Sequence, residues 1–425
     1  MKKFLLLSMV AAFSATSIFA QKSALSSAKR ALGSNDLAEA RTLIEQAKTN
    51  PETATNPETW KIAGDIGDKA FENERIKLTL GKEANEKAMY AGLLEAYYPY
   101  VKADSLGELP DSKGRVKNKV RKDIASILKA NQALYVNGGI FHYNNKEYKK
   151  AADFFEIYWN IPTLPMFQDK KNEFVFDSTY QTIKHYAVLT AIQGGDHERA
   201  IYFLNRAASE PFIENSTYVE SDIYELLASE YMQIGDTVKY VETLYAGAEK
   251  YPKSKYFIPN LINHFIRKGE NDKALEYLDT AIKNDPSNAC DLNTVKGALL
   301  VDKKQYDGAV MEYKKALAEN PQCESALEAL AVCYILQAQE LKDENVTLND
   351  RQKQIENDKK TVELYKLSLP YIEKYTELLK ARNADAHDIK GALIKLQNVY
   401  YNLSNFGVDK SKEMETIEAE LEALK

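Results

Sequence analysis

The sequence predicts an all-α protein, built as a right-handed α-solenoid of stacked helix-turn-helix repeats. A helical pattern of apolar and small residues recurs within residues 255–321. Ala274 and Ala309 are 35 residues apart, and so are Pro286 and Pro321. A helical apolar pattern with a period near this length is typical of a solenoid. The chain has 425 residues, more than one hydrophobic core usually supports, and only 18 Gly and 12 Pro. A long chain with few turn residues favours an array of long helices.

The charge balance excludes several classes of partner. Lys and Arg number 56 and Asp and Glu 62, which gives a formal net charge of −6. A mildly acidic chain with well-mixed charges is not expected to bind nucleic acid or an anionic membrane surface. Charged residues make up 28% of the chain and hydrophobic residues 44%, so the composition is not that of a disordered protein.

Residues 1–20 have the pattern of a secretory signal peptide. Lys2 and Lys3 form a positive start, residues 4–13 are a short apolar run, and the small residue Ala20 ends the segment. Cleavage is expected after Ala20. The alternative, a membrane anchor, is disfavoured because the apolar run is too short to cross a bilayer. The segment has no Cys that would carry a lipid, so the mature chain is expected to be exported, periplasmic and not membrane-spanning.

Apolar periodicity and turn residues divide the mature chain, residues 21–425, into about eight units. Most units pair two helices and end near a proline, since proline stops a helix. The predicted units are 22–51, 57–103, 118–162, 178–211, 218–252, 255–286, 288–321 and 324–382. Residues 384–425 are expected to form C-terminal capping helices, which keep the end of such an array soluble.

The early units differ in regularity. In the first, the Gly-Ser-Asn-Asp turn at residues 33–36 separates two helical faces and supplies a helix N-cap. The second is expected to carry an insertion, residues 72–82, between its helices. In the third, Gly138 and Gly139 predict a close helix contact, and a longer loop is expected at residues 163–177.

The later units are regular until the eighth, whose middle is charged. Residues 340–360 have few apolar side chains, which predicts either a solvated helix extension or a mobile loop. The partner helix resumes at Thr361 and contains Pro370. A proline inside a helix is expected to kink the helix or to mark the start of a new one.

The repeated pattern resembles the tetratricopeptide repeat (TPR) family. That family places large residues, Gly, Ala and Pro at fixed positions of each unit. Here the positions are filled by Leu261, Phe265, Gly269, Ala274, Leu278, Ala281 and Pro286, and again by Gly297, Leu300, Ala309, Tyr313, Ala316 and Pro321. The leader, the Tyr-rich composition and the C-terminal segment make the chain similar to exported TPR proteins of Bacteroidetes-type bacteria. The resemblance implies a binding scaffold and does not identify its partner.

The common catalytic signatures are missing from the sequence. It has no HExxH, GxSxG, GxxxxGK[ST], CxxC or strand-linked GxGxxG pattern, and its five histidines are scattered singly. Three cysteines are too few for a disulfide scaffold or a structural zinc site. We therefore expect no enzyme activity, no cofactor and no metal.

The concave groove of a solenoid, lined by the first helix of each unit, is the expected binding surface. First-helix spacing selects nine candidates for contact with a partner, although each is also compatible with a solvated position. They are Tyr143, Asn144, His185, Gln193, Glu225, Gln233, Asn263, Arg267 and Asp302. The set is mixed in polarity and has no repeated Lys, Asn and Arg, so it does not support the carboxylate-clamp mode of some TPR relatives.

Cys290 and Cys323 begin consecutive units, 33 residues apart. Stacked units bring such positions near each other, which allows a disulfide in an oxidising compartment. The alternative is that both are small residues at helix starts, too far apart to bridge. Cys333 lies on an apolar helix face and is expected to be a core thiol.

Together these features predict a non-catalytic protein–protein interaction scaffold of the cell envelope. Its partner would be a protein of unknown identity that places a peptide or helix in the groove, with association to an envelope complex. The alternative is a glycan-binding component of an outer-membrane uptake system. Proteins of that second class usually carry a lipid-anchor Cys, which this leader lacks.

Overall fold

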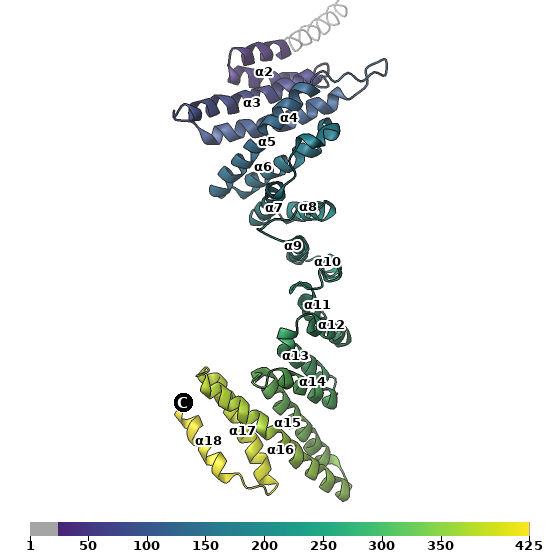
Figure 1. The fold of residues 1–425 in the computed structure, drawn as a ribbon, viewed down its shortest axis with the longest axis vertical. Helices are drawn as coiled ribbons and strands as arrows, with labels where there is room; N and C mark the ends of the chain where they lie inside the picture. Colours follow the sequence, from purple (N-terminus) through teal and green to yellow (C-terminus); the bar gives the residue numbers. More distant parts are fainter. Residues whose placement is uncertain (1–23, 425) are drawn as a thin grey trace, which may run out of the picture. The chain divides into compact units, whose positions relative to one another are not determined.

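The computed structural model describes residues 24–424, and these are mainly helical with no β-strand among them. Within each of the two compact units, helices pack against their neighbours in the chain, and the described residues confirm the predicted all-α repeat fold (Figure 1). The predicted signal peptide, residues 1–20, lies outside the described residues. No helix in the described part of the chain has an apolar stretch long enough to cross a membrane.

The chain forms two compact units, which meet in sequence at Thr237 and Val238. In the first unit, residues 24–33 are helical and lead into the numbered elements. These are α2 (Leu37–Thr49), α3 (Pro57–Thr79), α4 (Glu86–Gly107), α5 (Arg121–Asn144), α6 (Tyr148–Asn160), the 3₁₀ turns η1 (Ile161–Thr163) and η2 (Pro165–Glu173), α7 (Ser178–Gln193), α8 (His197–Ser209) and α9 (Ser221–Gln233).

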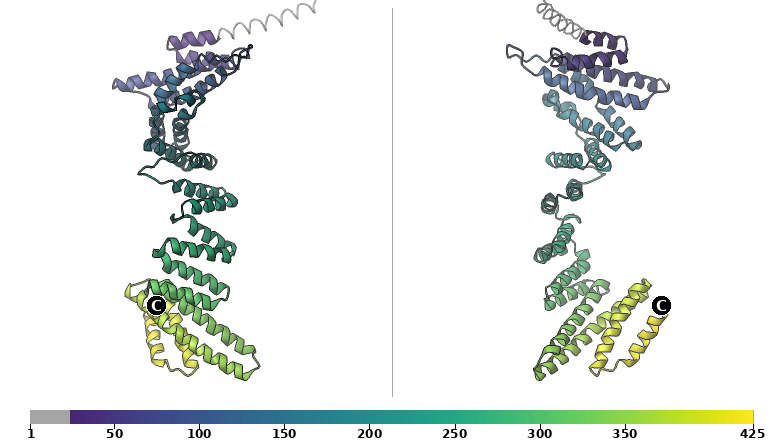
Figure 2. Two further views of the ribbon diagram at one scale, coloured as in Figure 1. Left: turned by 45° about the vertical axis from the view of Figure 1, so that its right-hand side comes forward. Right: turned by 180° about the vertical axis from the view of Figure 1, so that it is seen from behind.

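The second unit contains the remaining elements, and its helices also pack against their neighbours in the chain (Figure 2). They are α10 (Thr237–Lys250), α11 (Phe257–Lys268), α12 (Asn271–Asn284), the 3₁₀ turn η3 (Pro286–Asn288), α13 (Ala289–Asp302), α14 (Tyr306–Glu319), α15 (Glu324–Thr347), α16 (Arg351–Ala381), α17 (Ala386–Asn405) and α18 (Ser411–Ala423).

Short polar residues start many of these helices. The side chains of Asp36, Asn56, Asn85, Asp177 and Asp196 each accept a hydrogen bond from a backbone N–H in the first turn of the helix that follows. Such an N-cap satisfies a backbone donor that has no partner within the helix. These residues therefore fix where the hairpins of the first unit begin.

The core of the first unit is rich in aromatic side chains. Tyr100, Tyr135 and Phe154 are buried in one cluster that joins α4, α5 and α6. Phe167, which lies in η2, and Phe174, which follows η2, belong to the same cluster, with their rings 4.9 Å apart. The loop expected at residues 163–177 is therefore wrong in part, because much of this segment is 3₁₀ helix that buries aromatic side chains.

Two helices are more continuous than the sequence indicates. In the insertion expected at residues 72–82, the residues up to Thr79 are helical, because α3 runs without interruption through these positions. Its final turns contain ion pairs between Glu72 and Arg75 and between Glu74 and Lys77. Such i,i+3 pairs support a solvated helix without an apolar face.

In α16, Pro370 lies inside one continuous helix, so a new helix does not start there. Because proline has no backbone N–H, Pro370 cannot donate a hydrogen bond to the carbonyl of Lys366, four residues earlier. Both Lys366 and Pro370 are exposed, and water can satisfy that carbonyl. The charged residues 340–360 belong mainly to α15 and α16, which favours the helix-extension alternative.

The second unit depends on close contacts at glycine. A Cβ on Gly297 of α13 would lie 2.4 Å from Cε1 of Tyr313 on α14, so only glycine leaves room for the ring. Gly247 of α10 makes the same kind of contact with Phe257 of α11, at 2.3 Å. Cys290 and Cys323 form a disulfide with their Cα atoms 6.3 Å apart, which decides between the two alternatives for this pair.

Candidate functional site

An apolar hollow of the first unit lies between α5 and α7, with α6 beneath them. We call it the α5–α7 groove. Its volume is about 280 Å³, and its lining is Ile140, Tyr143, Phe155, Tyr186, Leu189, Thr190 and Gln193. Helices α5 and α7 are the first helices of successive hairpins, and α6 packs against both. The groove therefore lies where first helices were expected to form the binding surface.

The floor of the groove is set by Gly139 and Phe155. The Phe155 ring is only 2% exposed and presses against the α5 backbone at Gly139. A Cβ at residue 139 would lie 2.4 Å from Cε1 of that ring, which is closer than atoms can approach. The missing side chain thus lets the ring sink between the helices and leaves a recess above it.

The rim of the groove is formed by side chains that remain exposed. Ile140, Tyr143 and Tyr186 are 46%, 43% and 38% exposed. The Tyr186 ring lies 5.8 Å from the Phe155 ring, so floor and rim form one continuous aromatic surface. Exposed aromatic and aliphatic groups around a recess are typical of a binding surface.

The polar groups of the groove are few and partly satisfied. Thr190 Oγ1 donates to the carbonyl oxygen of Tyr186 at 2.6 Å, so its hydroxyl is already bonded to its own helix. The Gln193 amide and the tyrosine hydroxyls remain to orient a ligand, since a tyrosine combines an apolar ring with a polar tip. No residue of the lining is charged, in a chain of which 28% is charged.

The groove brings two predicted residues together and leaves others apart. Tyr143 and Gln193 both line it, and Asn144 is exposed beside Tyr143 as the last residue of α5. Glu225 is half-buried and Gln233 is exposed on α9, and neither lines a hollow described here.

His185, another of the predicted residues, contacts the segment that precedes α9. Its ring stacks on the ring of Tyr218, with centroids 3.9 Å apart and an angle of 17° between the planes. Burial against this neighbour lowers the pKa of His185, and the nearby charge of Asp222 opposes the shift. Tyr218 in turn donates its hydroxyl to the carbonyl oxygen of Gln181 at 2.6 Å. These contacts hold the segment before α9 against α7.

The last three predicted residues lie in the second unit. Asn263 and Arg267 are exposed one turn apart on α11, and Arg267 Nε donates to the carbonyl oxygen of Asn263 at 3.2 Å. Asp302 is the exposed final residue of α13. None of the three lines a hollow described here.

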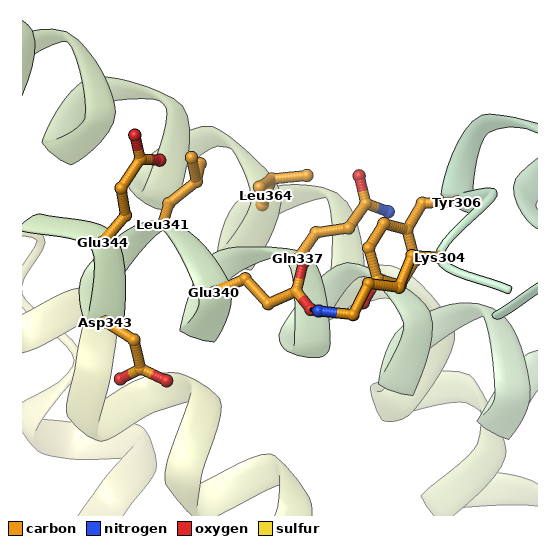
Figure 3. Close-up of a pocket in the computed structure, with 8 residues that line it drawn as sticks. All are labelled: Lys304, Tyr306, Gln337, Glu340, Leu341, Asp343, Glu344 and Leu364. Atoms are coloured by element: carbon orange, nitrogen blue, oxygen red, sulfur yellow. Dashed lines mark hydrogen bonds and ion pairs between the residues drawn. The ribbon is translucent and has the colours of Figure 1, made fainter. Parts of the chain in front are cut away.

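A larger hollow of about 620 Å³ lies in the second unit, where α15 and α16 extend beyond α13 and α14. The lining is Lys304, Tyr306, Gln337, Glu340, Leu341, Asp343, Glu344 and Leu364. Figure 3 shows Lys304, Tyr306, Gln337 and Glu340 gathered at one end. The hollow arises because α15 and α16 have 24 and 31 residues, whereas α13 and α14 have 14 each.

Lys304 and Glu340, two of the four charged residues that line this larger hollow, are already paired with each other at one end of it. Lys304 Nζ lies 2.8 Å from Glu340 Oε1, and hydrogen bonds from Lys304 and Tyr306 lower the pKa of Glu340. Satisfied charges in an open, solvated position offer little to a ligand. The α5–α7 groove is therefore the better candidate, because its exposed apolar surface has no partner within the lining.

Sequence reasoning did not select Ile140, Phe155 or Tyr186. Phe155 fits the apolar face of its own hairpin, a pattern that is also typical of an ordinary core residue. Ile140 lies directly after the Gly138-Gly139 pair and Tyr186 directly after His185. Shifting the first-helix register by one residue would have found Tyr186, whereas Ile140 lies one helical turn before the predicted Tyr143 and Asn144.

No protein-family profile matches the sequence, and no curated protein matches it. Among solved structures, YrrB, a TPR protein with an unusual peptide-binding site, aligns at 16% identity and a TM-score of 0.31, over 50% of this chain and 97% of YrrB. The C-terminal part of a TPR repeat-containing protein from Cytophaga hutchinsonii aligns at 15% identity and a TM-score of 0.33, over 61% of this chain and 93% of that chain. MamA aligns at 17% identity and a TM-score of 0.29, over 48% of this chain and 98% of MamA. Likenesses this distant carry no functional conclusion, so function is inferred from this chain's own side chains.

Proposed function

We propose that the chain is a non-catalytic scaffold of the TPR type that binds a peptide or helix of a partner protein in the α5–α7 groove. The observation that supports this is the uncharged lining of the groove, with an aromatic floor and exposed aromatic and aliphatic rims. Protein surfaces of this chemistry bind apolar side chains and exclude water around them.

The shape and chemistry of the groove describe the ligand. The recess above Phe155 suits one large apolar or aromatic side chain, and burying such a side chain contributes about 1.5–3 kcal/mol. The Gln193 amide and the hydroxyls of Tyr143 and Tyr186 are available for the backbone groups on either side of that anchor. A charged anchor would lose its hydration without gaining an ion pair.

The proposal includes export to the cell envelope, which rests on the residue pattern of positions 1–20. Mass spectrometry of the protein from the envelope fraction of its own cells would test this part separately. A mature N-terminus directly after Ala20 is the expected result. An uncleaved chain in the cytosol would contradict export and leave peptide binding to be tested by itself.

Binding is tested with peptides displayed on phage and selected against residues 21–425. We expect selected sequences to share one aromatic or aliphatic anchor. Fluorescence anisotropy with a selected peptide should show at least tenfold weaker binding to Ile140→Glu and to Tyr186→Ala, a loss of about 1.4 kcal/mol. Both side chains are exposed, so the variants should fold.

The matched control is Tyr202→Ala, which removes an exposed tyrosine from α8, outside the groove; Tyr202 is 56% exposed and Tyr186 38%. Its affinity for the peptide should equal that of the unchanged protein. Peptides whose binding is lost with Tyr202→Ala but kept with Ile140→Glu would place the site elsewhere. Failure to select any peptide with a common anchor would also overturn the proposal.

A further inference from the structure

The disulfide between Cys290 and Cys323 lies in an unusual polar setting. Asp291 follows Cys290, and its Oδ1 lies 3.8 Å from Cys290 Sγ. One ligand atom from each of Cys290, Asp291 and Cys323 lies within 4.8 Å of the others. Ser325 Oγ donates to Asp291 Oδ1 at 3.2 Å and lies 3.4 Å from Cys323 Sγ. Two sulfurs, a carboxylate and a hydroxyl thus converge on one small volume.

These are the donor types of a soft divalent cation. Zn²⁺ binds thiolates at about 2.3 Å and carboxylate oxygens at about 2.0–2.2 Å, and three protein ligands leave a fourth position for water. The Cα atoms of Cys290 and Cys323 are 6.3 Å apart, so side-chain rotation alone can open the sulfurs to the spacing of two ligands. Three cysteines alone are too few for a structural zinc site, but here the carboxylate of Asp291 supplies the third ligand.

The helices around the cluster favour its charge. Cys290 lies in the first turn of α13, and Cys323 is the N-cap of α15. Helix N-termini stabilise thiolates and other negative groups. A divalent ion with two thiolates and one carboxylate has a net charge of −1, so both helix ends stabilise the assembled site.

We infer that the reduced chain binds one soft divalent metal ion through Cys290, Cys323 and Asp291, so that the disulfide and the metal are alternative ways of joining the starts of α13 and α15. A dithiol reductant supplies two electrons and two protons, the Sγ–Sγ bond breaks, and the reductant becomes a cyclic disulfide. The ion then displaces the two thiol protons and binds both sulfurs.

The inference is tested with the full mature chain and Cd²⁺ alone as the probe. The chain is reduced with dithiothreitol, freed of reductant without oxygen, and titrated while the thiolate-to-cadmium absorption band is recorded. We expect one Cd²⁺ per reduced chain with release of two protons, and no such band from the oxidised chain. Melting of the reduced chain should shift upward when the ion is added, since a ligand of the folded state stabilises it.

Three variants identify the ligands. Cys290→Ser/Cys323→Ser should abolish the band, and Asp291→Asn should weaken the affinity by at least about tenfold, the smallest loss usual for groups that support a metal site. Cys333→Ser should bind as the unchanged chain does, because Cys333 is buried in a different cluster.

Two results would overturn the inference. One is a reduced chain that binds Cd²⁺ no better than the double serine variant. The other is an unchanged affinity in Asp291→Asn, which would remove the third ligand. Circular dichroism of each reduced variant separates loss of the site from loss of the fold.

Discussion

The ammonium of Lys184 on α7 lies 2.8 Å from the carboxylate of Glu210, the residue that follows α8. The Lys184 side chain is only 2% exposed. Glu210 also accepts hydrogen bonds from Trp159 Nε1 at 3.0 Å and from Arg206 Nε at 2.9 Å. A buried charge is tolerated only with such partners, so one carboxylate joins α6, α7 and the end of α8.

Removing the charge of Glu210 should destabilise the first unit strongly. Glu210→Gln leaves Lys184 buried without a counter-ion, which typically costs about 3–5 kcal/mol. Urea unfolding followed by tryptophan fluorescence would measure the loss, because Trp159 belongs to the cluster. The matched control, Glu58→Gln, breaks an exposed ion pair with Lys29 and should cost less than about 1 kcal/mol. Equal losses in the two variants would refute the importance of burial.

The same carboxylate predicts a pH dependence. Burial raises the pKa of Glu210, but Lys184, Trp159 and Arg206 lower it more, so its pKa in the folded state is below the usual value. An unfolded Glu titrates near about pH 4.3, so the stabilisation is complete above that pH and is lost as pH falls through the folded pKa. Glu210→Gln should flatten the decline of the melting temperature below about pH 4. A decline as steep as that of the unchanged chain would contradict this assignment.

Two glycines on helices should respond to alanine in opposite directions. Gly297→Ala places a Cβ 2.4 Å from the Tyr313 ring, and overpacking of this kind costs about 1–3 kcal/mol. Gly391→Ala on α17 meets only the flexible end of Lys395 at 4.0 Å, so it should stabilise by about 0.5–1 kcal/mol. Thermal melting of both variants checks the signs. A neutral Gly297→Ala would show that α13 and α14 can move apart.

Cutting the disulfide should loosen the α13–α14 hairpin. Cys290 and Cys323 are 33 residues apart in sequence, and closing a loop of this length contributes about 3–4 kcal/mol in the chain-entropy description. Hydrogen exchange of reduced, metal-free protein should therefore be faster in residues 289–319. Exchange in α5 and α6 of the first unit serves as the internal reference and should not change. Equal protection in both redox states would show that packing alone holds the hairpin.

Much of the fold could be predicted from the sequence because the repeat contacts are local. Ala274 and Ala309, the pair that revealed the period, are both fully buried. Gly297, one of the small residues of the repeat pattern, touches Tyr313. Small residues at a fixed spacing report where neighbouring helices meet, and that information is present in the residue types themselves.

The missed features depend on residues distant in sequence or on polar interactions. The end of α3 is supported by ion pairs such as Glu74–Lys77, which leave no apolar periodicity to detect. Lys184 is a residue type expected in solvent, and its burial depends on Glu210, which lies 26 residues later. The residues around Lys184 in the sequence do not indicate that it pairs with Glu210, and those around Glu210 do not indicate Lys184.

The candidate site was predictable only in outline. First-helix spacing led to Tyr143 and Gln193, which line the α5–α7 groove. The floor residue, Phe155, comes from a second helix, and its place in the groove depends on how α6 packs between α5 and α7. That packing is a tertiary property, so the pattern of one helix does not contain it.

The depth of the recess above Phe155 is controlled by a single hydrogen atom, the one that takes the place of a side chain at Gly139. One nucleotide converts a glycine codon to an alanine codon. Under the proposed function, selectivity for a bulky anchor would thus change with one substitution at residue 139, a position that does not line the groove. Comparison of natural variants at residue 139 with the size of the side chain they accept would trace that history.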